Sequence, residues 1–301
     1  MLACFLFFSP GCGDPGDASF GGVPDGEPRL VVMSPGLAMI LRDLGLADRI
    51  VGRHGYDRVT PSSVEVAGDE TRLDYEALLR VNPTAVILQD GGRPTPERLT
   101  DLARERGWAI HRVPVLALDD VRSAIGTMDR LGRGAGAEGP EGSAASERAR
   151  ELVRSFDAAL AERAGLAERM GRTLVLGSTD PPGAMGPGSF HYELVARLGA
   201  EPAPAAGSAW MNLSVEDVVR LDPDSLVLVM PGAPEWADGG GDRGGVLGRL
   251  SEVGLRAVST GRVVVVRDEH GQLPSTSLIG VAQRVAEAGL GWEPIGGGAD
   301  G

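Results

Sequence analysis

The sequence predicts an α/β protein with two Rossmann-like lobes, each built on a parallel sheet, that are joined by a long α-helix. Three observations support this fold class. Strands alternate with helices over residues 29–117 and again over residues 172–290. One stretch of sequence, residues 75–88, returns at residues 215–228, once in each lobe. Between the lobes, residues 144–164 have the periodicity of an amphipathic helix.

The repeated stretch combines a short helix with a strand. Each copy has a glutamate, an apolar pair, an arginine, one apolar residue, Asn or Asp, a proline and then an apolar run. Glu76 and Glu216 fall in the first helical turn, where a carboxylate suits the positive end of the helix dipole. Pro83 and Pro223 end the helices, and we expect the residue before each proline to be extended. The copies lie 140 residues apart, too far for a solenoid repeat of ~20–50 residues, and they indicate two similar lobes.

The first lobe, residues 29–117, begins with a strand at 29–33. Ser34 is predicted to cap the helix that follows, and Pro35 occupies the first helical position. This order predicts a parallel sheet covered by helices. The remaining elements are strands at 50–52, 64–68, 85–89 and 109–113 and a helix at 96–106.

Residues 118–171 form the connecting helical segment. Asp119 and Asp120 start a first helix, and a Gly-rich break follows at 132–143. Residues 144–164 then place apolar side chains on one face and opposite charges on the other. A helix of about 20 residues spans ~30 Å, which is long enough to bridge two lobes.

The second lobe, residues 172–290, repeats the α/β alternation around the second copy of the repeat. Residues 178–189 are rich in Gly and Pro and are predicted to be a loop. Residues 291–301 are predicted to be a disordered tail. The other expected elements are strands at 172–177 and 262–267, a helix at 191–198 and a closing helix at 276–288.

The N-terminus has the pattern of an exported protein. An apolar run over residues 1–8 is followed by Ser9-Pro10-Gly11-Cys12, which is typical of a bacterial lipoprotein signal with lipid attached to Cys12. Residues 1–12 would then be the signal, and residues 13–28, rich in Gly, Pro and Asp, a flexible tether. A plain secretory signal or another export route, and a disordered start, remain alternatives. No later stretch has the ~20 apolar residues that a membrane-spanning helix needs.

The composition argues against several classes of function. A formal net charge of −13 disfavours nucleic acid and anionic membrane surfaces as partners. Both cysteines, Cys4 and Cys12, precede the lobes, so the lobes have neither a disulfide nor a thiolate site. Residues 134–139 spell G-x-G-x-x-G, but they follow a helix rather than a strand and do not predict nucleotide binding. No hydrolase, metalloprotease or ATPase motif is present, so we expect no catalysis.

Taken in order, these features resemble the bacterial ABC-importer substrate-binding proteins for cobalamin, ferric siderophores and haem. The resemblance covers residues 29–290. It implies a ligand cleft between the lobes, an ABC permease and its ATPase as partners, and no resident cofactor. It further implies a monomer in the periplasm or at the cell surface, held to the membrane by its lipid anchor alone. In such proteins one acidic residue on each lobe pairs with arginines of the permease, and Glu76 and Glu216 occupy those positions.

The resemblance also implies which residues contact the ligand. Tyr56 and Trp210 match two aromatic contacts of the cobalamin-binding branch, and rings suit a flat macrocycle because each buries ~150–250 Å². Glu70 and Gln89 stand where that branch has two further tryptophans, so the corrinoid match is incomplete. The polar ligand contacts that we expect are Ser34 with Pro35 at a helix start, Ser189 in the second lobe, and Arg53. Arg53 and Arg58 flank Tyr56 and could hold carboxylates or phosphate, with solvated surface arginines as the alternative.

We therefore expect a receptor for a small-molecule metal chelate, with a corrinoid favoured and a ferric siderophore next. Haem, held by a histidine or by Tyr56, is an alternative. Bare zinc or manganese would need three histidines and a carboxylate, but the spacing of His54, His111, His191 and His270 does not indicate such a site. A ligand sensor and an α/β enzyme that uses the cleft are the remaining alternatives.

Overall fold

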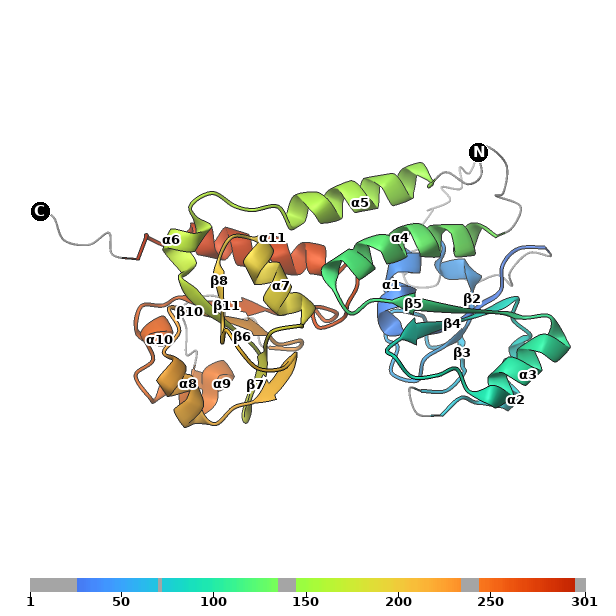
Figure 1. The fold of residues 1–301 in the computed structure, drawn as a ribbon, viewed down its shortest axis with the longest axis horizontal. Helices are drawn as coiled ribbons and strands as arrows, with labels where there is room; N and C mark the ends of the chain where they lie inside the picture. Colours follow the sequence, from blue (N-terminus) through green and yellow to red (C-terminus); the bar gives the residue numbers. More distant parts are fainter. Residues whose placement is uncertain (1–25, 70–71, 135–144, 234–243, 296–301) are drawn as a thin grey trace, which may run out of the picture.

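The computed structural model describes residues 26–69, 72–134, 145–233 and 244–295. It contains two α/β lobes that lie side by side, and this confirms the predicted fold class (Figure 1). The expected lipidation site Cys12, nearly all of the expected tether at 13–28 and the last six residues of the expected tail lie outside the described residues. Within the described ranges, no helix has both the length and the apolar character needed to cross a bilayer.

The first lobe contains a five-stranded, fully parallel sheet in the order β3-β2-β1-β4-β5. β1 and β4 are fully apolar where they pair, as expected for strands covered by helices on both faces. The predicted elements are confirmed with small changes of boundary. They are β1 Leu30–Met33, α1 Pro35–Asp43, a 3-10 turn Ala47–Arg49, β2 Ile50–Arg53, β3 Glu65–Val66, α2 Tyr75–Val81, β4 Ala85–Asp90, α3 Glu97–Arg106 and β5 Ala109–Pro114.

The second lobe contains a mixed sheet in the order β11-β10-β6-β7-β9, with β8 also paired to β6. β6, β8, β10 and β11 are parallel to one another, whereas β7 pairs antiparallel with both β6 and β9. The predicted loop at 178–189 is therefore wrong in part, because β7 lies within it. The elements are β6 Arg172–Thr179, β7 Pro182–Met185, α7 Phe190–Arg197, β8 Glu201–Ala203, β9 Trp210–Asn212, α8 Val215–Leu221, β10 Ser225–Val229, α9 Gly244–Leu247, a 3-10 turn Gly248–Ser251, α10 Arg256–Ser259, β11 Val263–Val266 and α11 Leu278–Leu290.

The two copies of the repeat fold alike. Each forms a seven-residue helix, α2 or α8, followed by a central strand, β4 or β10. The expectation of an extended residue before each proline is wrong, because Asn82 and Asp222 both adopt left-handed conformations, with φ of 42° and 37°. Asn and Asp tolerate this region, and here each backbone N–H closes its helix by donating to Leu78 or Val218.

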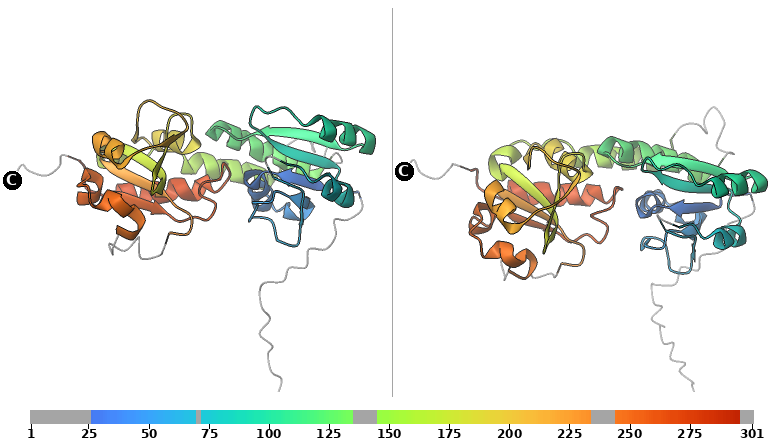
Figure 2. Two further views of the ribbon diagram at one scale, coloured as in Figure 1. Left: turned by 90° about the horizontal axis from the view of Figure 1, so that it is seen from below. Right: turned by 60° about the horizontal axis from the view of Figure 1, so that its bottom comes forward.

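The connection between the lobes uses two helices, α4 (Leu118–Arg133) and α5 (Glu147–Ala159), and the short helix α6 (Leu166–Met170) follows. The expected helix over 144–164 is wrong in length: α5 has 13 residues, or ~20 Å, and Ser146 caps its start. The expected break at 132–143 begins too early, because α4 continues to Arg133, and its remainder lies outside the described residues. α5 runs along one side of the molecule across both lobes (Figures 1 and 2). A bidentate ion pair, Arg122 with Asp157 at 2.7 and 2.9 Å, ties α5 to α4.

One hydrophobic core continues through both lobes. It combines side chains of β1 and α1, of α4 and α5, and of β10 and α11, including the fully buried Phe156. Polar contacts between the lobes reinforce it. The loop before α11 donates from Thr276 Oγ1 to Asp43 Oδ2 of α1 at 2.5 Å, and Leu118 N donates to Glu193 Oε2 of α7 at 3.1 Å. The lobes are therefore joined by packing as well as by the chain.

Candidate ligand-binding site

The first sheet reverses its order between β1 and β4, and open α/β sheets bind ligands at the carboxyl ends of the strands beside such a switch point. Ser34 directly follows β1, and Gln89 lies near the end of β4. The Ser34 hydroxyl donates to Gln89 Oε1 at 2.9 Å. It also accepts from Leu37 N, which confirms the predicted cap of α1. The sequence thus places polar side chains from both strands at this switch point.

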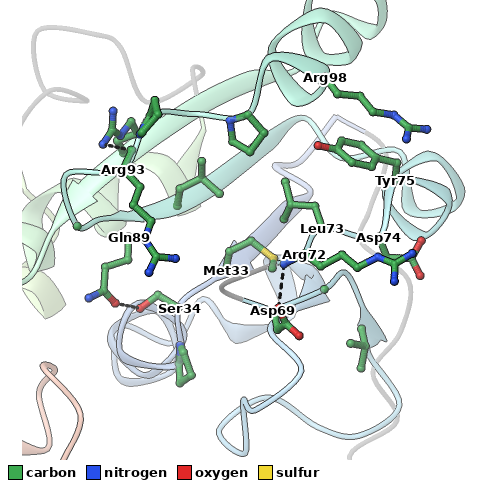
Figure 3. Close-up of a pocket in the computed structure, with 18 of the residues that line it drawn as sticks. Met33, Ser34, Asp69, Arg72, Leu73, Asp74, Tyr75, Gln89, Arg93 and Arg98 are labelled. Carbon is green, nitrogen blue, oxygen red and sulfur yellow. Dashed lines mark hydrogen bonds between the residues drawn. The ribbon is translucent and has the colours of Figure 1, made fainter.

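A cavity of about 1470 Å³ opens over this edge of the sheet (Figure 3). Two of the predicted ligand contacts, Ser34 and Pro35, line it, as do Gln89 and Glu76. Pockets for drug-sized molecules usually hold ~300–1,000 Å³, so this cavity suits a larger ligand. Four arginines also line it, namely Arg72, Arg93, Arg98 and Arg112.

These arginines differ in their surroundings. Arg112 donates to Asp90 at 2.5 Å and to the carbonyl of Arg93 at 2.7 Å, which fixes the loop after β4. Arg98 lies 4.3 Å over the ring of Tyr75. Arg93 extends its side chain toward Ser34 and Gln89 (Figure 3). Sequence reasoning missed Arg93, because nothing in its local sequence separates it from a surface arginine.

Trp210, a predicted ligand contact, is held by its own lobe. A Cβ on Gly183 would lie 2.4 Å from its indole ring, and one on Gly177 would lie 3.0 Å away, so the ring rests directly on two glycines. Its Nε1 donates to Asn212 Oδ1 at 3.1 Å. The side chain nevertheless stays 49% exposed. The lobe therefore holds the ring in one orientation while leaving aromatic surface open to a ligand.

The switch point of the second sheet, between β6 and β10, is occupied by the protein itself. Gln272 donates through Nε2 to the carbonyls of Gly177 at 3.1 Å and Val229 at 2.7 Å. The same loop is anchored by His191, whose buried ring donates from Nε2 to the carbonyl of Gly271 at 2.7 Å. Burial lowers the pKa of His191 to about 4, against a smaller opposing effect of this hydrogen bond.

The two switch points lie close to the contact between the lobes. Pro274 lies two residues after Gln272. The carbonyl oxygen of Pro274 would be 2.7 Å from a Cβ on Gly36 in the first turn of α1. Ser275 Oγ contacts Met39 Sδ of the same helix at 3.0 Å. The polar end of the first sheet therefore adjoins the second lobe, as a ligand site between lobes requires.

Tyr56, the other predicted aromatic contact, is 77% exposed on the loop after β2. Gly55 N donates to the carbonyl of Gly68, a cavity residue, at 2.7 Å, but Tyr56 itself is not among the residues that line the cavity. Arg53 donates to the carbonyls of Val64 at 3.1 Å and Asp57 at 3.0 Å. Arg53 thus fixes the loop that carries Tyr56.

Ser189 caps α7 by accepting from Tyr192 N at 3.2 Å, and its contact with a ligand stays a prediction. Gln89 and Glu70 stand where the cobalamin-binding branch has two further tryptophans. Gln89 lies at the switch point, and Glu70 lies outside the described residues. Within the described ranges, no group of three His, Cys, Asp or Glu side chains is placed to hold a metal ion.

The two predicted docking residues, Glu76 and Glu216, are exposed in the first turns of α2 and α8. Figure 1 shows these helices along the same edge of the molecule, one on each lobe, opposite α4 and α5. Their caps are Asp74 and Ser214. The repeat therefore places two similar acidic helix starts on one face.

The sequence of the chain matches a known protein family. The family described as "Periplasmic binding protein" matches residues 30–269. An uncharacterised ABC transporter substrate-binding lipoprotein of Bacillus subtilis (strain 168) is 24% identical over 213 residues, which cover 67% of this chain and 63% of that protein. The chain thus matches less than two thirds of that relative's length.

Solved structures share the fold at low identity. The periplasmic vitamin B12 binding protein BtuF of Vibrio cholerae aligns with a TM-score of 0.66 and 19% identity, over 88% of this chain and 97% of that one. The periplasmic haem-binding protein HutB of Vibrio cholerae aligns with a TM-score of 0.66 and 18% identity, over 86% of this chain and 98% of that one. The periplasmic haem-binding protein RhuT from Roseiflexus sp. RS-1 aligns with a TM-score of 0.61 and 23% identity, over 88% of this chain and 100% of that one.

Proposed function

Because the chain belongs to the periplasmic binding protein family, we propose that it is an extracytoplasmic receptor that captures a small metal chelate for an ABC importer. The observation that carries this proposal is the cavity at the switch point of the first sheet, which residues of the first lobe line, together with the contact between α1 and Pro274 of the second lobe. The family and its structural neighbours are binding proteins, so capture and release, without turnover, is the expected activity.

Capture combines contacts from both lobes. Ser34 and Gln89 supply polar groups at the base of the cavity, and Pro35 continues its wall. Trp210 supplies a fixed, half-exposed ring from the second lobe, and Tyr56 supplies a second ring from the loop after β2. A flat chelate between such rings gains from burial of aromatic surface. Arg53 and Ser189 support this arrangement by fixing the loop of Tyr56 and the start of α7.

Delivery uses the two repeated helices. Glu76 and Glu216 would pair with arginines on the permease, one from each lobe, and the ATPase would act through that permease. An exposed ion pair contributes only ~0.2–1 kcal/mol, so two pairs set the orientation of docking more than its affinity. The lipid anchor at Cys12 would keep a monomeric receptor near its permease, in the periplasm or at the cell surface, and the lipoprotein relative supports this placement.

Cobalamin, a ferric siderophore and haem are the candidate chelates, and proteins named for vitamin B12, haem or iron are among the structural neighbours. We would titrate the purified protein with each, following tryptophan quenching and the mass of the intact complex. Micromolar or tighter binding of one chelate that Trp210→Ala weakens is the expected result. Absence of binding to all three would contradict the receptor function, and turnover of a small molecule would favour an enzyme.

A further inference from the structure

Near α2, the cavity of the first lobe is lined by both carboxylates and arginines, namely Glu65, Asp69, Asp74 and Glu76 with Arg72 and Arg98. Asp74 accepts from two backbone N–H groups of α2, and Glu65 pairs with Arg80 at 2.6 Å, so these two carboxylates are engaged within the lobe. At the other end, Arg93 extends toward Ser34 and Gln89 (Figure 3). A ligand that enters the cavity meets hydrogen-bond donors at the switch point.

The positive charge of Arg93 is available to a ligand. The nearby carboxylate of Asp90 is already paired with Arg112 at 2.5 Å. Arg112 also donates to the carbonyl of Arg93, so the backbone of Arg93 is fixed while its side chain stays exposed. Among the described residues, the Arg93 guanidinium has no ion-pair or hydrogen-bond partner.

Gln89 adds a second donor. Its Oε1 accepts from the Ser34 hydroxyl, which leaves the amide Nε2 and its two hydrogens for the cavity. The resemblance to the cobalamin-binding branch would place tryptophan here, and an amide replaces that apolar surface with hydrogen-bonding capacity. In the second lobe, Gln272 already fills the matching switch point. The polar part of a ligand is therefore received by the first lobe.

We propose that Arg93 and the Gln89 amide bind a carboxylate of the ligand, with the Ser34 hydroxyl holding Gln89 in place, so that this receptor is selective for an acidic metal chelate over a neutral corrinoid. The inference rests on the proposed receptor function. It replaces the corrinoid, which the sequence favours, with an acidic chelate as the expected ligand. A guanidinium matches a carboxylate through two parallel hydrogen bonds, and such charge-assisted bonds are the strong ones. Trp210 would cover the apolar part of the same ligand from the second lobe.

The test compares chelates with and without carboxylates on the purified full-length protein. Haem and ferric citrate carry carboxylates, whereas cyanocobalamin and a ferric trihydroxamate without carboxylates do not. We expect Arg93→Gln to weaken binding of the carboxylate chelates by about 10- to 100-fold and of the others by less than about 2-fold. Arg93→Lys should give an intermediate loss, because it keeps the charge but not the paired geometry.

The matched control is Arg104→Gln on α3, where the arginine is exposed and pairs with Asp101 at 2.8 Å. It removes one positive charge from the same lobe and should leave binding of every chelate unchanged. Tight binding of a neutral chelate that is insensitive to Arg93→Gln would overturn the acidic-ligand inference and leave the receptor function intact. Failure of the wild-type protein to bind any of the four would overturn both.

Discussion

The ring of Trp210 packs against Gly177 and Gly183, so a single added methyl group can test whether its position matters for ligand binding. In Gly183→Ala, the new Cβ would lie 2.4 Å from Cζ2 and 2.7 Å from Cη2 of the indole ring, and 2.6 Å from Ser178 Oγ. Carbon atoms in contact are normally ~3.5–4.0 Å apart, so the ring has to retreat by about 1 Å. The backbone of Gly183 is not in the left-handed region, so the substitution acts through space alone.

The displaced ring should lose its place against the ligand before the lobe loses stability, because half of the side chain faces solvent and can move outward. Well-oriented aromatic contacts are worth ~0.5–1.5 kcal/mol, which corresponds to a roughly 2- to 12-fold loss of affinity. Titration with the chelate that binds wild-type protein measures this loss. Acrylamide quenching, with Trp210→Phe as reference, should show that the indole becomes more accessible.

The control is Gly126→Ala in α4, where the nearest atom to the new Cβ is Arg130 Nη1 at 3.7 Å. This variant should bind like wild type and be slightly more stable, because alanine favours a helix over glycine. If Gly183→Ala binds its ligand with wild-type affinity and shows unchanged quenching of Trp210, the argument that the two glycines set the ring position is refuted.

Three further predictions concern docking, pH and the repeat. Glu76→Gln with Glu216→Gln should weaken binding to permease vesicles by about 2- to 30-fold, from two pairs of ~0.2–1 kcal/mol each, and leave chelate binding unchanged. The pKa of His191 is lower in the fold, about 4, than its ordinary value of 6.5, so its stabilisation is complete above pH 6.5 and is lost as the pH falls toward 4. Urea unfolding should give ~2 kcal/mol less stability at pH 5 than at pH 7.5, and His191→Gln should reduce that difference. At Asn82 and Asp222, alanine should lower the unfolding free energy by ~1 kcal/mol more than glycine does, because only glycine adopts left-handed backbone without strain.

Each of these predictions has its own control. Glu147→Gln removes a first-turn carboxylate on α5, away from the docking face, and should not affect docking. An unchanged pH difference in His191→Gln would show that other groups cause it. Equal stability of the alanine and glycine variants at both positions before proline would contradict the strain argument.

Local signals predicted much of the fold. Ser34 followed by Pro35 specifies a helix start through its own hydrogen bond, and the structure has that bond. The two copies of the repeat give the same helix and strand in both lobes. Such elements depend on neighbours within a few residues, so the sequence reveals them directly.

The features that were not predicted depend on contacts with residues far away in the sequence. β7 contains Pro182 and Gly183, which weaken the local strand signal, and it forms because β6 and β9 pair with it. Arg93 becomes a candidate contact only once β4 and Arg112 place it beside Gln89. Gln272 reaches two strands that precede it by 95 and 43 residues, and no local pattern indicates such a contact.

For the proposed receptor, the core shared by the lobes would affect the rate of uptake. A receptor with a free hinge can present one docking surface when empty and another when loaded. Here the packed core and the contact between Thr276 and Asp43 join the lobes that carry α2 and α8, so we expect the separation of these two helices to change little on ligand binding. A partner that binds two states equally well cannot discriminate between them. Empty receptor should therefore compete with loaded receptor for the permease, and uptake should slow when receptor is in large excess over its ligand.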